Sequence, residues 1–309
     1  MVDVNYVFLL SLSIIVIGFI IKKLNIITES NGKILAKIIL NVTLPALILN
    51  VVSKLKINLT LIFLPIISLI YSLSIMGIGL IIFKKVSKQY KGLILMTIVG
   101  YNIGLFAYPL IQGIWGDIGL EYIAMFDIGN SFVIFGLCYF VGSYFSPAQN
   151  DSSKKGNYSY IFKQMAKSIP LNALYIALII NLSGINLPIF VYDLLEIISR
   201  ANMALVLLLL GIYLNFNFER SQWKYISIAL TTRYSLGLVT GIILYYILPF
   251  DKFFRNILLI SLILPIGMAI IPFSVEFEYD QKLSGSLVNL SIVISFGLMW
   301  VLIIFLTMS

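Results

Sequence analysis

The residues best suited to bind a small molecule belong to a pattern that occurs twice, 163 residues apart, inside long apolar runs. Each copy begins with an asparagine or a proline, has a glycine two residues later and a proline five residues after the glycine. Proline removes a backbone donor and crowds the preceding turn, and glycine adopts backbone angles that other residues avoid. The pattern therefore predicts that one helix in each half of the chain unwinds in mid-span. Asp117 and Asp280 extend the match in the same register. The candidate binding residues are Asn102, Gly104, Pro109, Pro265, Gly267 and Pro272.

A helix that breaks inside a membrane leaves amides without partners at one new end and carbonyls at the other. The amide ends and the helix dipoles favour anions, so a carboxylate can be held there without a buried cationic side chain. Asn102 can add its side-chain amide, and Gly104 and Gly267 leave room for close approach. Paired interruptions at matching places in two halves point to a transporter binding site.

The competing interpretation of the pattern is that the two segments only kink packed helices, since glycine and proline are frequent in membrane spans. One such segment alone favours a kink. Two segments in register favour a binding site.

Three ionisable or polar residues inside predicted spans are candidates for coupling. Asp127 is followed one turn later by Asn130, so both can face the same side of a helix. An intramembrane carboxylate is a candidate for proton or cation coupling, and a structural salt bridge or hydrogen bond is an equally open interpretation. Arg233 either attracts an anionic substrate or pairs with an acid such as Asp127, and the sequence does not choose between them.

A second polar group lies in the predicted seventh span, where Asp193, Glu196 and Arg200 are spaced three and four residues apart. This spacing indicates a stripe of side chains that satisfy one another rather than a substrate site.

The residue types that most catalytic and metal sites need are scarce. The chain has no histidine and one cysteine, Cys138. The usual zinc ligand and general base are therefore missing, and no phosphate-binding glycine loop is present. We predict no catalytic residue, no metal site and no cofactor, apart from a coupled proton or sodium ion.

Composition defines the elements that must position these residues. Apolar residues make up 60% of the chain, charged residues make up 11%, and the mean hydropathy is +1.03. These values indicate a polytopic membrane protein, and the apolar runs are long enough for ten transmembrane helices. The ten predicted spans cover residues 4–21, 34–53, 57–83, 92–116, 118–145, 168–192, 188–214, 224–248, 256–275 and 283–309.

The distribution of positive charge predicts the orientation. With the N-terminus outside, inward-facing connections hold 14 of the 21 Lys and Arg residues and outward-facing connections hold four. Positive residues favour the cytoplasmic side, so we predict a multi-pass protein of the cell membrane with both termini outside. The net charge of +8 then needs no nucleic acid partner.

The span count also predicts the domain organisation. Residues 1–145 form a first five-helix repeat, 146–168 a cytoplasmic linker with an amphipathic helix, and 169–309 a second five-helix repeat. Because each half has an odd number of spans, the two halves enter the membrane from opposite sides, which makes the 5+5 repeat inverted.

These features resemble the auxin efflux carrier family, which includes the plant PIN carriers and prokaryotic permeases for organic anions. The resemblance covers nearly the whole chain. It implies an all-α fold in which helices 4 and 9 are broken and cross, helices 3–5 and 8–10 form a transport domain, and helices 1, 2, 6 and 7 form a scaffold that often dimerises. The segments that carry it are Leu44-Pro45-Ala46-Leu47, residues 102–109, Leu210-Gly211, Arg233 and Leu264-Pro265-Ile266-Gly267.

Three departures from the plant pattern weigh against auxin itself as the substrate. The connection between the fifth and sixth spans is short, the eighth span lacks a proline, and Pro265 stands where an asparagine would make the two arms alike. These departures leave the predicted fold unchanged.

The sequence therefore predicts a secondary transporter for a small organic anion such as a mono- or dicarboxylate, working by alternating access at the helix 4/9 crossing. Its expected partners are this anion, the lipid bilayer and a second copy of the chain at the scaffold helices. The alternatives are an ion-coupled symporter of the bile-acid type and a channel or ligand-sensing membrane protein. A membrane enzyme is disfavoured.

Overall fold

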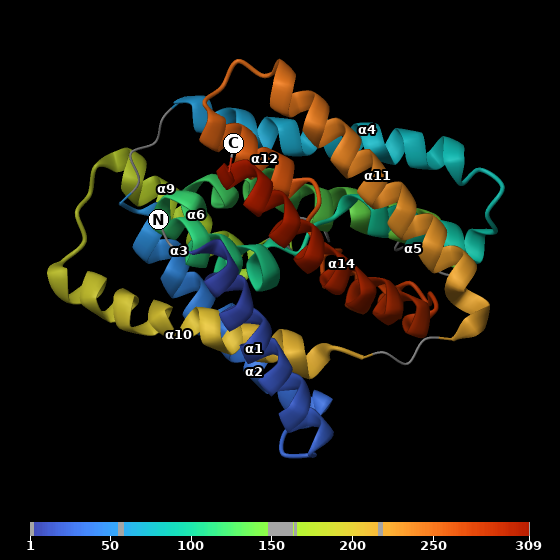
Figure 1. Cartoon of the computed structure of the whole chain (residues 1–309), viewed down its shortest axis with the longest axis horizontal. Helices are drawn as coiled ribbons and strands as arrows, with labels where there is room; N and C mark the ends of the chain where they lie inside the picture. The colour runs from blue at the N-terminus through green and yellow to red at the C-terminus, as the bar shows by residue number, and fades with distance from the viewer. Residues whose placement is uncertain (1–2, 55–58, 148–162, 164–165, 216–218, 309) are drawn as a thin grey trace. The chain divides into compact units, whose positions relative to one another are not determined.

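The structure, a computed structural model, describes residues 3–54, 59–147, 163, 166–215 and 219–308. All regular elements within these ranges are helices (Figure 1), and one isolated antiparallel bridge joins Tyr101 to Ile266. The predicted linker and amphipathic helix, residues 146–168, lie largely outside the described residues.

Within the described ranges, seven helices are long and apolar enough to cross a membrane, which supports the prediction of a polytopic membrane protein. They are Val4–Lys23, Ser30–Val52, Leu59–Ile82, Ile103–Tyr144, Ile189–Tyr213, Arg220–Ile247 and Gln281–Thr307. The 42-residue segment is divided at Gly116, whose φ of 64° and ψ of −153° are not helical. Glycine tolerates this positive φ, and the sequence placed the boundary between its fourth and fifth spans at this residue.

Three short helices, which belong to the predicted fourth and ninth spans, cannot cross a membrane alone. They are α5 (Lys88–Val99), α12 (Lys252–Ser261) and α13 (Ile270–Glu276). At about 1.5 Å per residue they reach about 10 to 18 Å, against about 30 Å of hydrocarbon. The predicted fourth and ninth spans thus each consist of two helical pieces. The count of ten crossings and the inverted relation of the halves stay predictions.

The described chain forms two compact units. Unit 1 comprises residues 1–61, 103–125 and 166–214, and unit 2 comprises residues 62–102, 126–165 and 215–309. Both units are therefore assembled from three separate stretches of chain.

Unit 1 is built on the pair of α1 (Val4–Lys23) and α10 (Ile189–Tyr213), which cross in Figure 1 as the dark blue and yellow helices. Gly18 of α1 and Gly211 of α10 lie where the two backbones touch, with their Cα atoms close together. The other elements are α2 (Glu29–Ile38), the π-helical turn η1 (Ile39–Thr43), α3 (Leu44–Val52), α9 (Ile169–Ser183), the π-helical turn η3 (Ile103–Ala107) and the first part of α6 (Tyr108–Phe132).

Unit 2 is organised around α11 (Trp223–Ile247), which packs against α5, α12 and α14 (Gln281–Met308). Its remaining elements are the end of η2 (Leu59–Ile62), α4 (Phe63–Ile82), the last part of α6, η4 (Val133–Cys138), α7 (Tyr139–Tyr144), η5 (Arg220–Gln222) and α13. Both interrupted spans meet in this unit.

The units differ from the implied division into scaffold and transport domain in one segment. Residues 103–125 belong to unit 1, whereas the resemblance assigns all of helices 4 and 5 to the transport domain. The local packing explains this. A Cβ at Gly104 would lie 3.1 Å from Leu44, and one at Gly113 would lie 3.0 Å from Val7.

Prolines account for two π-helical turns in unit 1. The turns at 39–43 and 103–107 each end two residues before a proline, Pro45 and Pro109. Because a proline ring crowds the carbonyl four residues earlier and removes a hydrogen bond, the preceding turn widens rather than breaks.

The α1–α10 contact can be tested with one methyl group. In Gly211→Ala the new methyl would overlap the carbonyl oxygen of Ile15. We expect a loss of about 1–3 kcal/mol of stability, seen as a lower apparent melting temperature of the purified protein. Gly77→Ala is the matched control, because no described atom lies within 4 Å of its Cβ position. Equal melting temperatures for the two variants would contradict this packing.

Candidate functional site at two helix interruptions

The two interruptions pair with each other through their backbones. Residues 100–102 separate α5 from η3, and residues 262–269 separate α12 from α13. The amide of Asn102 donates to the Pro265 carbonyl at 2.9 Å, and the amide of Gly267 donates to the Gly100 carbonyl at 3.2 Å. The structure thus brings together Asn102, Pro265 and Gly267.

The two candidate glycines have different surroundings. A Cβ at Gly267 would lie 2.8 Å from a side-chain carbon of Ile134 and 3.3 Å from the carbonyl oxygen of Tyr101, so this glycine permits the backbones to approach. Gly104 is half-buried in unit 1, where a Cβ would meet only Leu44 within 4 Å among the described atoms.

The two candidate prolines lie after the unwound residues, not within them. Pro109 is the second residue of α6 and Pro272 is the third residue of α13. The helix resumes at Ile103 and Ile270, ahead of each proline. Pro272 loses little there, because the first amides of a helix have no intrahelical acceptor, whereas Pro109 follows the π-helical turn η3. The unwinding is therefore set by the residues before the prolines.

Arg233 of α11 joins the two interruptions. Its side chain is 1% exposed, and its guanidinium donates to carbonyls on both segments. On the first segment Nη1 donates to Thr97 at 2.7 Å and Nη2 to Gly100 at 3.1 Å. On the second, Nη2 donates to Leu264 at 2.8 Å and Pro265 at 3.1 Å, and Nε to Leu264 at 3.2 Å. Among the described residues its hydrogen-bond partners are these carbonyls, so of the two open interpretations of Arg233 the structure does not show the pairing with Asp127.

The ring of Tyr101 completes the surroundings of this cation. The guanidinium carbon of Arg233 lies 4.4 Å from the centre of the ring, which is a cation–π distance. The Tyr101 hydroxyl donates to the Leu262 carbonyl at 3.3 Å. One residue of the first interruption thereby stabilises both the arginine and the second interruption.

Asn130 of α6 replaces the missing backbone partners of Tyr101. Its side-chain oxygen accepts from the Tyr101 amide at 2.9 Å, and its side-chain nitrogen donates to the Tyr101 carbonyl at 3.1 Å. The same nitrogen donates to the half-buried carboxylate of Asp127 at 3.1 Å. The two residues that the sequence placed one turn apart therefore connect a carboxylate to the unwound backbone.

The second interruption relies on α14 in a way that the sequence analysis missed. The hydroxyl of Ser291 accepts from the Ile266 amide at 3.0 Å, and the hydroxyl of Ser295 donates to the Ile263 carbonyl at 2.7 Å. Both serines are fully buried. Serines 284, 291 and 295 are spaced so that they share one face of this predicted span, and that periodicity was the signal available in the sequence.

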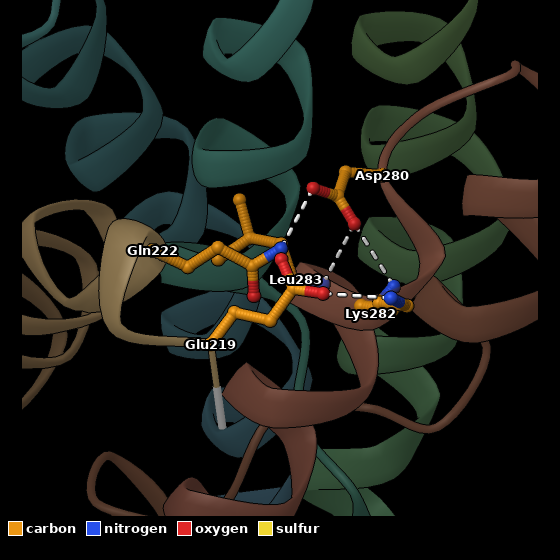
Figure 2. A network of polar contacts seen from close by, with 5 residues as sticks. All are labelled: Glu219, Gln222, Asp280, Lys282 and Leu283. Carbon is orange, nitrogen blue, oxygen red and sulfur yellow. Dashed lines mark hydrogen bonds and ion pairs between the residues drawn. The ribbon is translucent and has the colours of Figure 1, made fainter. Parts of the chain in front are cut away.

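The repeated aspartate Asp280 has a structural role. Figure 2 shows that one of its carboxylate oxygens accepts from the amides of Lys282 and Leu283, both at 3.0 Å, at the start of α14. The other oxygen accepts from Gln222 at 2.8 Å, and Lys282 forms a 2.7 Å ion pair with Glu219. Asp280 is thus a helix cap that also fastens the start of α11 to α14.

The predicted polar stripe of α10 lies apart from these residues in the chain's other unit. Arg200 forms a 2.6 Å ion pair with Glu196, and both side chains are exposed, as is Asp193. The spacing therefore gave the correct pair. Within the described residues, no three His, Cys, Asp or Glu side chains come together as a metal site would require.

Asn130→Ala tests the substitute pairing of Tyr101. The change leaves a buried amide and a buried carbonyl without this partner, so we expect a loss of about 2–5 kcal/mol of stability and a lower apparent melting temperature. Asn172→Ala is the control, because this asparagine makes an exposed bond to the Ala166 carbonyl. If both variants melt together with the wild type, Asn130 does not hold the interruption.

Comparison with known proteins found similarity over almost the whole chain. The sequence matches the family model described as "Membrane transport protein" over residues 6–303. An "uncharacterized transporter" of Methanocaldococcus jannaschii is 28% identical over 291 residues, 91% of each chain. A second "uncharacterized transporter", from Methanothermobacter thermautotrophicus, is 24% identical over 289 residues, 92% of each chain. The similarity extends across both interruptions.

Proposed function

We propose that this chain, which belongs to the membrane transport protein family, is a secondary transporter that carries a small organic anion, a mono- or dicarboxylate, across the cell membrane. The resemblance to the auxin efflux carrier family is confirmed by the family match and by the two transporter relatives. The family and these relatives are transporters rather than enzymes. The observation that carries the proposal is the pairing of two interrupted helices through Asn102 and Gly267.

The charges around the interruptions support an anion as cargo. The carbonyl end of α5 carries a partial charge of about −0.5, which the Arg233 guanidinium compensates at Thr97, and the same guanidinium compensates the Leu264 and Pro265 carbonyls beyond the end of α12. The helix that resumes at Ile103 presents its amide end, with about +0.5, next to Asn102. A carboxylate would therefore meet a positive end, while the negative ends are already occupied.

Asp127 is the proposed coupling residue. Its carboxylate contacts Asn130, which in turn holds the Tyr101 backbone, so a change of its charge state would be felt at the interruption. A proton or a sodium ion bound at Asp127 would lower the local negative charge and favour an anion nearby. This makes ion-coupled transport the specific form of the proposal.

Alternating access is the proposed mechanism. Both interruptions and the residues that hold them lie in unit 2, so this unit can move as one body without breaking their bonds. The proposed arrangement is the crossing of helices 4 and 9 within ten spans, with a second copy of the chain at the scaffold helices. Within unit 2 the proposed substrate site comprises Asn102, Pro265, Gly267 and Pro272.

The substrate proposal is tested by replacing Asn102 with alanine. In liposomes loaded with unlabelled malonate or indole-3-acetate, we expect the wild type to accumulate the same labelled anion by counterflow. Asn102→Ala should weaken apparent affinity about tenfold, since it removes one hydrogen bond to a charged group. Asn172→Ala should transport normally. Unchanged affinity in Asn102→Ala would remove this residue from the site, and flux without counterflow would indicate a channel.

The coupling proposal is tested by replacing Asp127 with asparagine. Asparagine keeps the hydrogen-bonding shape but cannot ionise, so counterflow should continue while accumulation driven by a proton or sodium gradient is lost. Accumulation is measured in liposomes with an imposed gradient of each ion in turn. Glu196→Gln, which alters the exposed pair on α10, is the control. Gradient-driven accumulation that survives in Asp127→Asn would exclude this carboxylate as the coupling site.

A further inference from the structure

Arg233 carries a charge that is buried in an apolar bundle, and such a charge is costly unless its surroundings compensate it. The side chain is 1% exposed, and each of its three nitrogens donates to at least one backbone carbonyl. The carbonyls come from both interruptions. We propose that Arg233 is a positioning residue that fixes the two interrupted helices in one register, and that it does not bind the transported anion.

The geometry argues against direct contact with cargo. Nη1 and Nη2 point at the carbonyls of Thr97, Gly100, Leu264 and Pro265, at 2.7 to 3.1 Å. The Tyr101 ring lies against the guanidinium carbon at 4.4 Å. To bind a carboxylate, Arg233 would have to release carbonyls that have no other source of charge-assisted hydrogen bonds of this strength.

The same geometry explains why the clamp holds the register. Gly100 accepts from Arg233 and also from the Gly267 amide, and Pro265 accepts from Arg233 and also from the Asn102 amide. Both backbone-to-backbone bonds between the interruptions therefore end on carbonyls that Arg233 also holds. Slippage of one segment by a residue would break both sets of bonds at once.

The role requires arginine rather than any cation. The four carbonyls are spread around a planar guanidinium, and arginine presents five donors in a fixed fork. Lysine keeps the positive charge but concentrates three donors at one atom. Arg233→Lys consequently separates a clamp, which needs the fork, from an anion ligand, which needs mainly the charge.

The inference is tested by amide hydrogen exchange, followed by mass spectrometry on the purified protein without ligand. In Arg233→Lys we expect exchange to accelerate about tenfold or more in peptides covering residues 97–104 and 262–269, with unchanged exchange in α4 and α10. Arg233→Gln, which lacks both fork and charge, should accelerate the same peptides further. Arg255→Lys is the matched control, because this arginine also donates to a backbone carbonyl, that of Tyr245, at 3.0 Å.

Two results would overturn the inference. One is wild-type exchange in Arg233→Lys, which would show that charge alone suffices. The other is acceleration spread equally over all helices, which would show that Arg233 supports the fold in general rather than the interruptions.

A second test of the inference measures transport, and this test, unlike hydrogen exchange, rests on the proposed function. In liposomes that show counterflow of malonate or indole-3-acetate, Arg233→Lys should raise the KM for the transported anion about tenfold. The reason is that the side-chain amide of Asn102 would be displaced and would bind the anion less well. A lysine variant with wild-type KM would contradict the clamp. If the wild type itself moves neither probe, the proposed substrate class fails while the exchange result still decides the clamp.

Discussion

A helix that is interrupted inside an apolar bundle must find partners for every backbone group that the interruption exposes, and this requirement governs unit 2. In hydrocarbon each amide or carbonyl without a hydrogen bond costs several kcal/mol. A few such groups together would cost about as much as the entire free energy of unfolding of a small domain. Four consecutive carbonyls beyond α12, those of residues 262–265, all accept hydrogen bonds. Their donors come from the first interruption, from α14 and from α11. The unit is therefore held together by hydrogen bonds to the two interruptions in addition to apolar packing.

The two interruptions have different hydrogen-bond partners because the two copies of the sequence pattern are chemically different. The antiparallel pairing uses the amide of Asn102 and the carbonyl of Pro265, so the missing amide of the proline is not needed there. The first interruption spans three residues and is completed by Asn130. The second spans eight residues and draws on Ser291 and Ser295 as well. A departure from the symmetric family pattern, Pro265, thus fits the position that it occupies.

The sequence predicted the location of the interruptions better than the means by which they are held. The pairs Asp127–Asn130 and Glu196–Arg200 follow from helical spacing, and the structure places each pair in hydrogen-bonding contact. The partners of Arg233 could not be predicted, because backbone carbonyls are present at every residue and leave no mark in the sequence. Ser291 and Ser295 were missed for a related reason, since serine is common in membrane helices and satisfies itself there through the preceding turn. Residues 103–125 joined unit 1 through close packing at Gly104 and Gly113, which spacing alone does not reveal.

The use of carbonyls rather than an acid to compensate Arg233 has a consequence for transport. An ion pair with Asp127 would have tied the charge of the arginine to the protonation state of that carboxylate. With carbonyl partners the guanidinium stays charged and fixed, since arginine does not lose its proton in proteins. In the proposed coupling, a change of charge at Asp127 would leave the bonds of Arg233 intact, while Asn130 connects Asp127 to the unwound backbone at Tyr101. The paired interruptions and a neighbouring carboxylate can therefore coexist in one unit, as the proposed ion-coupled carrier would require if its binding site is to keep its shape while its charge changes.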